Sequence, residues 1–404
     1  MSESSVAAES PHRTATIPFS LTRGGPAYEA MRRVGLVTRD SPRVVLRSLL
    51  LIAITWVPLV ILAAVEGVAL GDRVTVPFLL DVTVYARFLL AFPLLIMAGP
   101  AVDRRLGRAV NGLLSTGIVP DTERPKLEAA VGRLTRMRDW IVPEVLILVL
   151  GFLASWFTRH AVFEASISSW QVLGAGSDAR VTLAGRWLNL IGMPIYSFLV
   201  LRWFWRIGIW TAFLRRVSKL ELRLVPTHPD RVAGLGFLGG AHCVFGFIVA
   251  TLSIGIAGRG AFLVMYAGWT LDTLKGALWV FLAFALVLAF GPLLVFTPAL
   301  MRVKKKGTLE YGGLAARYVR SFDRKWVRGE TEGEESLLGT ADIQSLADIG
   351  NSFQVIKEMR PVPVSTRHVL SVLLAGVLPM LPLLATVVPV KVLLEQLLKL
   401  LGKG

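Results

Sequence analysis

The sequence predicts an all-α fold, a polytopic transmembrane helical bundle of about seven spans with a small cytoplasmic helical layer. Composition is the first reason. Of the 404 residues, 54% are hydrophobic, and the mean hydropathy is +0.60. Only 18% are charged, whereas soluble domains usually carry about a quarter. A soluble domain has no interior for so much apolar surface, but a bilayer accepts it.

Apolar runs of suitable length are the second reason. Each approaches the ~20 residues that a helix needs to cross the hydrocarbon. The runs cover residues 47–66, 83–100, 141–158, 187–205, 239–257, 274–299 and 368–389.

The distribution of basic residues predicts the orientation. The formal net charge is +16, and Lys and Arg gather in the N-terminal segment and in residues 101–140, 206–231 and 302–328. These segments alternate with loops poor in Lys and Arg, so the positive-inside rule places the N-terminus in the cytoplasm. This pattern is explained by membrane topology and anionic lipid, and nucleic acid is not an expected partner.

The runs divide the chain into four parts. Residues 1–46 form a cytoplasmic N-terminal segment that we expect to be partly disordered, because its start is rich in Ser, Thr, Pro and Gly. Residues 47–300 form the membrane domain, with inward helical extensions at 101–140 and 206–238. Residues 301–366 are a cytoplasmic helical segment, and 367–404 hold the final span and a C-terminal amphipathic helix. Apolar stripes at helical spacing in the cytoplasmic parts predict the helical layer.

Two segments carry a resemblance. Residues 225–238 read VPTHPDRVAGLGFL, and residues 336–351 read SLLGTADIQSLADIGN. Both resemble a family of uncharacterised bacterial inner-membrane proteins, over most of the chain. The resemblance implies a bacterial inner (plasma) membrane location and no particular activity.

Ionisable residues near the inner ends of spans are the main candidates for a functional site. Glu144 lies just inside the third span, and Arg202 and Arg206 lie near the end of the fourth. Charges at this depth are costly and usually pair or face a wet cavity. They predict a charged vestibule, with Glu144 paired to Arg202 or Arg206. For the arginines, an interfacial belt of Arg and Trp with snorkelling side chains is an equal alternative.

His228 and Asp230 are the second candidate, because His can titrate near neutral pH and a carboxylate can orient it. We favour a structural turn, in which Pro226 and Pro229 break the helix and Asp230 caps the chain that follows. Scattered histidines and one cysteine, Cys243, predict no metal site or cofactor.

A basic helix in the 301–366 segment predicts contact with anionic lipid. Its candidate residues are Lys304, Lys305, Lys306, Arg317, Arg320 and Arg324. The expected partners are therefore membrane lipids, anionic on the cytoplasmic side, and a homo-oligomer is left open.

Three functions are compatible with these residues. The first is a channel- or transporter-like protein with a charged cytoplasmic vestibule. The second is a non-enzymatic membrane scaffold or sensor that binds a partner through cytoplasmic amphipathic helices. The third is a lipid-modifying enzyme using His228 and Asp230, which ranks last because no nucleophile or metal accompanies them.

Overall fold

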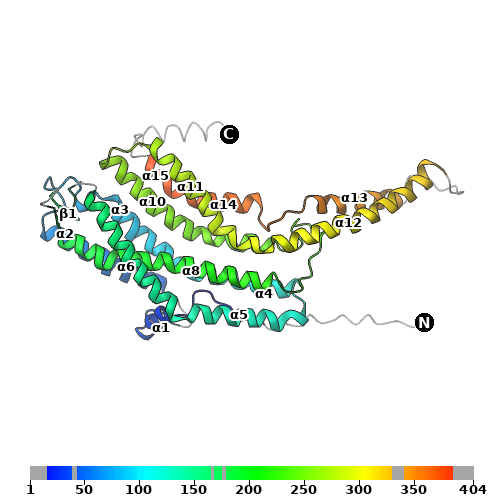
Figure 1. Cartoon of the computed structure of the whole chain (residues 1–404), viewed down its shortest axis with the longest axis horizontal. Helices are drawn as coiled ribbons and strands as arrows, with labels where there is room; N and C mark the ends of the chain where they lie inside the picture. Colours follow the sequence, from blue (N-terminus) through cyan, green and yellow to red (C-terminus); the bar gives the residue numbers. More distant parts are fainter. Residues whose placement is uncertain (1–15, 39–42, 165–167, 175–178, 330–340, 385–404) are drawn as a thin grey trace.

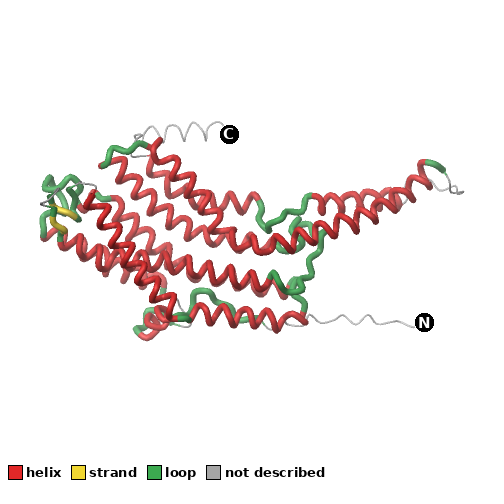
Figure 2. The backbone as a smooth tube through the Cα atoms, viewed as in Figure 1, coloured by secondary structure: helices red, strands yellow, loops and turns green. Residues whose placement is uncertain are grey.

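A computed structural model describes residues 16–38, 43–164, 168–174, 179–329 and 341–384. Most of its long helices run along the longest axis of the molecule (Figures 1 and 2). Within the described residues, 6 helices are long and apolar enough to cross a membrane, or up to 7 when the bent pair α5–α6 counts as one span. The predicted all-α bundle is confirmed.

The helices follow the predicted apolar runs. The candidate spans, in chain order, are α2 (Val44–Val65); α3 (Val82–Val84), η2 (Tyr85–Ala91) and α4 (Phe92–Ser115); α6 (Ile141–Glu164); α7 (Leu183–Trp187), η5 (Leu188–Gly192) and α8 (Met193–Val217); α9 (Gly236–His242), η6 (Cys243–Phe245) and α10 (Gly246–Tyr266); α11 (Leu271–Phe290), η7 (Gly291–Phe296), α12 (Thr297–Phe322) and η8 (Asp323–Val327); and α14 (Thr366–Val377), η9 (Leu378–Met380) and α15 (Leu381–Leu384). The other elements are α1 (Pro26–Arg33), η1 (Phe78–Leu80), η3 (Asp121–Glu123), α5 (Arg124–Asp139), α13 (Ala341–Lys357), β1 (Val172–Leu173) and β2 (Arg180–Val181).

Prolines explain most irregular turns in the spans. The π-helical turns η2 and η5 end just before Pro93 and Pro194, and the 3-10 turn η7 contains Pro292. A proline lacks the N–H for the bond to residue i−4 and clashes with that carbonyl, so the preceding turn loosens or tightens. Pro143, in the first turn of α6, likewise disturbs the helix before it: α5 and α6 meet at Trp140 with a bend of 43°.

Several spans have apolar side chains directed away from the protein. On α6, Phe157 is 70% exposed, and on α11, Val280 is 71% exposed. A helix that is apolar all round and little buried by its own protein is solvated by lipid.

One end of the bundle, here called the basic end, carries the extensions of α4, α8 and α12 beyond the apolar runs. Part of the predicted helical layer is present there, as α5 packs against α8. Two details differ from the prediction. Helix α8 ends at Val217, and residues 218–235 contain no helix. Pro226 and Pro229 keep the later part of this stretch out of a regular helix. In addition, α12 and α13 form a hairpin that projects beyond the bundle instead of packing beneath it (Figure 1).

The N-terminal segment also differs from the prediction. Residues 16–25 were expected to be partly disordered, but they lie against the bundle as an irregular stretch without helix or strand, in which Ile17 and Leu21 are buried in the main core. We call residues 16–38, which include α1, the N-terminal plug. Residues 1–15 and the expected amphipathic helix after residue 384 lie outside the described residues.

The opposite end is closed by a small cap. Strands β1 and β2 pair antiparallel, and Asp81 accepts a hydrogen bond of 2.9 Å from Trp170 Nε1. Around this pair a second core cluster forms from the outer turns of α2, η2 and α7.

Candidate functional site: a charged cavity beneath the N-terminal plug

Asp103 on α4 holds the N-terminal plug. Its Oδ1 accepts backbone N–H groups of Leu21 (2.7 Å) and Thr22 (3.0 Å). Its Oδ2 accepts the hydroxyl groups of Ser20 (2.8 Å) and Thr22 (2.6 Å). The carboxylate is buried, so these four bonds replace its hydration, and charge-assisted bonds of this kind are the strong ones.

Glu144 and Arg202 form the ion pair that the sequence predicted. Glu144 Oε1 lies 2.7 Å from Arg202 Nη2, and both side chains are buried. The second oxygen, Oε2, accepts the N–H of Ala27 at 2.7 Å. Ala27 lies in the first turn of α1, where unpaired N–H groups and the helix dipole favour a carboxylate. Gly25 adopts φ 88°, and a Cβ there would meet Glu144 Oε1 at 2.9 Å, so glycine is required for this approach.

Two more arginines reach the same place. Arg206 Nη2 donates to the carbonyl of Thr22 at 3.2 Å, and its guanidinium lies 5.1 Å from the centre of the Trp203 ring. Arg47, near the start of α2, has a buried Nε with no hydrogen-bond acceptor in the described part of the chain. No carboxylate of those ranges forms an ion pair with either of these two arginines.

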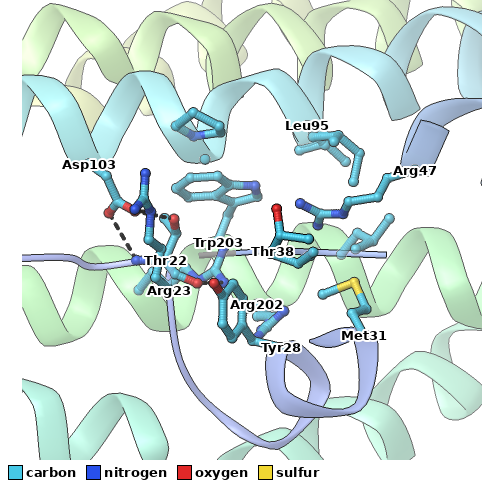
Figure 3. Close-up of a pocket in the computed structure, with 16 residues that line it drawn as sticks. Thr22, Arg23, Tyr28, Met31, Thr38, Arg47, Leu95, Asp103, Arg202 and Trp203 are labelled. Carbon is cyan, nitrogen blue, oxygen red and sulfur yellow. Dashed lines mark hydrogen bonds and ion pairs between the residues drawn. The ribbon is translucent and has the colours of Figure 1, made fainter. Parts of the chain in front are cut away.

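These groups surround a partly open cavity of about 50 Å³ between α2, α4, α8 and the plug. Figure 3 shows Arg47 entering from one side and Asp103 from the other, with Arg202, Trp203 and Thr22 between them. The space has room for one or a few water molecules. Its lining includes four guanidinium groups, those of Arg23, Arg47, Arg202 and Arg206, and one carboxylate, that of Asp103. A second carboxylate, that of Glu144, pairs with Arg202 from outside the lining. The site therefore has a surplus of positive charge.

His228 and Asp230 do not line this cavity. Asp230 instead accepts the backbone N–H groups of Val232 (2.9 Å), Gly234 (3.1 Å) and Gly236 (2.8 Å), and His228 Nδ1 lies 2.8 Å from Asp230 Oδ1. Partial burial by itself raises the pKa of Asp230, but the backbone N–H groups and His228 outweigh it and hold that pKa below its usual range.

The same loop is fixed to the chain after α13. Arg360 Nη2 donates to the carbonyl of Asp230 at 2.8 Å, and Arg231 pairs with Glu358 at 2.8 Å. The predicted turn, fixed by His228, Asp230 and a neighbouring segment, is confirmed.

The candidate lipid-binding residues lie on α12 and in the turn that follows it. Lys304 Nζ donates to the Met359 carbonyl at 2.8 Å, so it anchors the hairpin. The remaining five are exposed: Lys305, Lys306, Arg317 and Arg320 on α12, and Arg324 in the π-helical turn η8 that follows it. Their contact with anionic lipid stays a prediction.

Sequence reasoning did not find Asp103, Arg47 or the plug. Asp103 is followed by two arginines in a basic segment, where a carboxylate looks like an ordinary surface residue. It also did not find the buried His242, whose Nε2 accepts from Trp210 Nε1 at 2.9 Å and whose Nδ1 lies 2.8 Å from the Ala289 carbonyl. With both nitrogens engaged, His242 is a packing residue that links α8, α9 and α11.

The fold and this arrangement define an integral membrane protein with an all-α bundle of six to seven apolar helices. No protein-family model, curated protein or solved structure matches the chain. Among the described residues, no group of three or more His, Cys, Asp or Glu side chains could hold a metal ion.

Proposed function

We propose that the chain is a channel- or transporter-like protein of the bacterial inner membrane, with its basic end in the cytoplasm, and that its charged vestibule admits small anions. The orientation rests on the repeated asymmetry of Lys and Arg between successive loops. The bacterial inner membrane rests on the resemblance of residues 225–238 and 336–351.

The surplus of arginine around this cavity carries the proposal. Arg202 has Glu144. Within the described ranges, Arg206 contacts the Thr22 carbonyl and the Trp203 ring but forms no ion pair with a carboxylate, and the Nε of Arg47 has no acceptor. Buried guanidinium groups without carboxylates favour an anion beside them, because an unpaired charge away from water is costly. A snorkelling belt explains these arginines less well, since Arg202 and Arg206 are buried.

The plug supports a closed conformation of such a path. It reaches the cavity from the basic end and is held by Asp103 and Glu144, which accept backbone N–H groups from Leu21, Thr22 and Ala27. Release of the plug would open the arginines to the solution. Losing one charge-assisted bond of about 1.5–3 kcal/mol would shift such an equilibrium tenfold or more.

Halide flux into proteoliposomes tests this function. Vesicles with an entrapped halide-quenched dye would receive wild-type protein, Asp103→Asn or the control Asp121→Asn, an exposed carboxylate outside the site. We expect Asp103→Asn to raise halide entry well above the wild type and Asp121→Asn to leave it unchanged. Halide entry equal to that of empty vesicles for all three proteins would contradict the proposal.

The scaffold or sensor remains a second candidate because of the hairpin. Leu314 on α12 and Ile343 on α13 are 43% and 41% exposed, although each belongs to an apolar stripe. A two-helix hairpin covers such stripes only in part. Under this alternative, Leu314→Glu would abolish the cellular phenotype of the protein while halide flux stays intact.

A lipid-modifying enzyme at His228 has the least support. The Asp230 carboxylate is occupied by three backbone N–H groups and by His228. The carboxylate therefore stabilises the loop. The enzyme hypothesis would be supported only if His228→Ala gave a protein that is stable but inactive.

A further inference from the structure

A second cavity lies on another face of α8, in the half of the bundle opposite the basic end: Phe204 lines it, whereas the adjacent Trp203 lines the vestibule. It is a cleft of about 710 Å³ between α8, α10 and α11, with η2 and α15 at its edges. Its wall is mostly apolar and includes Leu252, Leu278 and Phe281. Two residues at its mouth, Val280 and Phe284, are 71% and 44% exposed on the lipid-facing side of α11. The cleft therefore opens laterally toward the acyl chains.

Two arginines line this apolar cleft. Arg87 lies in η2, within two turns of the start of its span, and Arg259 lies in α10, within two turns of its end at Tyr266. Helix α10 approaches η2 closely at Gly258, where an added Cβ would lie 2.8 Å from the Cβ of Ala86. This close approach brings the residues next to Gly258 and Ala86, which are Arg259 and Arg87, to the same cleft.

Among the described residues, neither arginine forms an ion pair with a carboxylate. Arg87 Nη1 contacts the Met193 sulfur at 3.2 Å, which is a weak acceptor, and its guanidinium lies 5.6 Å from the centre of the Tyr196 ring. Arg259 lies 5.1 Å from the centre of the Phe262 ring. Uncompensated charges inside a membrane bundle are expensive and usually mark a binding site or pathway.

The geometry points to an anionic phospholipid as the occupant, and we propose that this cleft is a specific site for one. The negatively charged headgroup phosphate would lie between Arg87 and Arg259, since guanidinium groups bind phosphate with two parallel hydrogen bonds. One acyl chain would follow the wall formed by Leu278 and Phe281. Both arginines lie near the end of their spans, at a depth from which arginine side chains reach the headgroup region.

Native mass spectrometry of the purified protein with added phosphatidylglycerol tests the site. We expect the wild type to retain one phosphatidylglycerol and Arg87→Gln to bind it at least tenfold more weakly. The matched control is Arg186→Gln, because Arg186 is an exposed arginine in the same half of the bundle that does not line the cleft. Equal affinity of Arg87→Gln and Arg186→Gln would overturn the proposal.

A second variant keeps the test valid if Arg87→Gln does not fold. Ala277 is exposed and lines the cleft, so Ala277→Trp would fill the apolar part and leave both arginines in place. We expect it also to weaken phosphatidylglycerol binding at least tenfold, and unchanged binding would overturn the proposal. Displacement of the lipid by inorganic phosphate, or equal affinity for phosphatidylcholine, would likewise overturn it, because the ligand would then be a free anion or an unselected lipid.

Discussion

The carboxylate of Glu144 lies 2.7 Å from Nη2 of Arg202 and accepts the N–H of Ala27 with its other oxygen. One buried side chain therefore joins the third span, the fourth span and the N-terminal plug. The pair has two consequences for the molecule: it compensates the charge of Arg202, and it fixes α1 at the mouth of the charged cavity.

Removing this carboxylate should destabilise the protein. Breaking a buried pair by removing one partner costs about 3–5 kcal/mol, because the other charge is left uncompensated. Glu144→Gln should therefore lower the melting temperature of the protein in detergent clearly more than a control substitution does. The control is Glu310→Gln, whose exposed side chain lies 3.7 Å from Lys306, since exposed pairs contribute only about 0–1 kcal/mol. Equal, small changes in both variants would mean that Glu144 is solvated.

Asp230 should make stability depend on pH in the acid range. Its pKa is held below the usual value in the folded protein, so its ionised form stabilises the fold. This contribution is complete above the unfolded pKa of about 4 and is lost as the pH falls through the lower folded pKa. The melting temperature of wild type should therefore exceed that of Asp230→Asn at neutral pH, and the difference should shrink toward about pH 3. A difference that grows on acidification would contradict this assignment.

Gly239 should tolerate no side chain. A Cβ at this position would overlap the Pro363 carbonyl and lie 2.6 Å from His368 Nδ1. Gly239→Leu should thus reduce folded protein much more than His228→Ala, because the His228 side chain is 45% exposed and its Nδ1 contacts the carboxylate and the backbone N–H of Asp230. Fluorescence-detected size-exclusion profiles of both variants measure this. Gly132→Leu, at a glycine with open space around it, is the matched control and should behave like wild type.

Apolar periodicity and charge placement were sufficient to predict the membrane helices and the pairing of Glu144. Both follow from local composition and from the depth at which a residue enters the bilayer. Pro226, Pro229 and Asp230 likewise indicated a turn, because their effect on the backbone is local.

The plug could not be predicted in this way. Ser20, Leu21 and Thr22 have the composition of a flexible tail. They are held by residues far away in the sequence, because Asp103, more than 80 residues away, accepts their hydrogen bonds and Leu21 is buried in the main core. In the sequence, Arg47 looks like an ordinary basic residue flanking a span. Its position beside Arg202 and Arg206 results from the packing of α2 against α4. Long-range contacts of this kind leave no periodic signal in a single sequence.

The orientation of the bundle can be measured by cysteine labelling in a Cys243→Ala background. A thiol reagent that does not cross the membrane should leave Arg216→Cys and Lys305→Cys unmodified in intact cells, because both exposed positions lie at the basic end. Asp72→Cys, exposed in the loop at the opposite end, should react. Labelling of the first two positions and protection of the third would reverse the proposed topology.

The most direct test of an anion path closed by the plug is to lock the plug in place. A Cβ built at Gly99 lies 3.9 Å from the Cβ of Thr22, within the ~3.5–4.5 Å that a disulfide requires. The pair Thr22→Cys and Gly99→Cys, in the Cys243→Ala background with Asp103→Asn to favour opening, should show little halide flux when oxidised. Reduction should restore it to the level of the Thr22→Cys single variant. Equal halide flux before and after reduction, with the disulfide verified by mass spectrometry, would contradict a path beneath the plug.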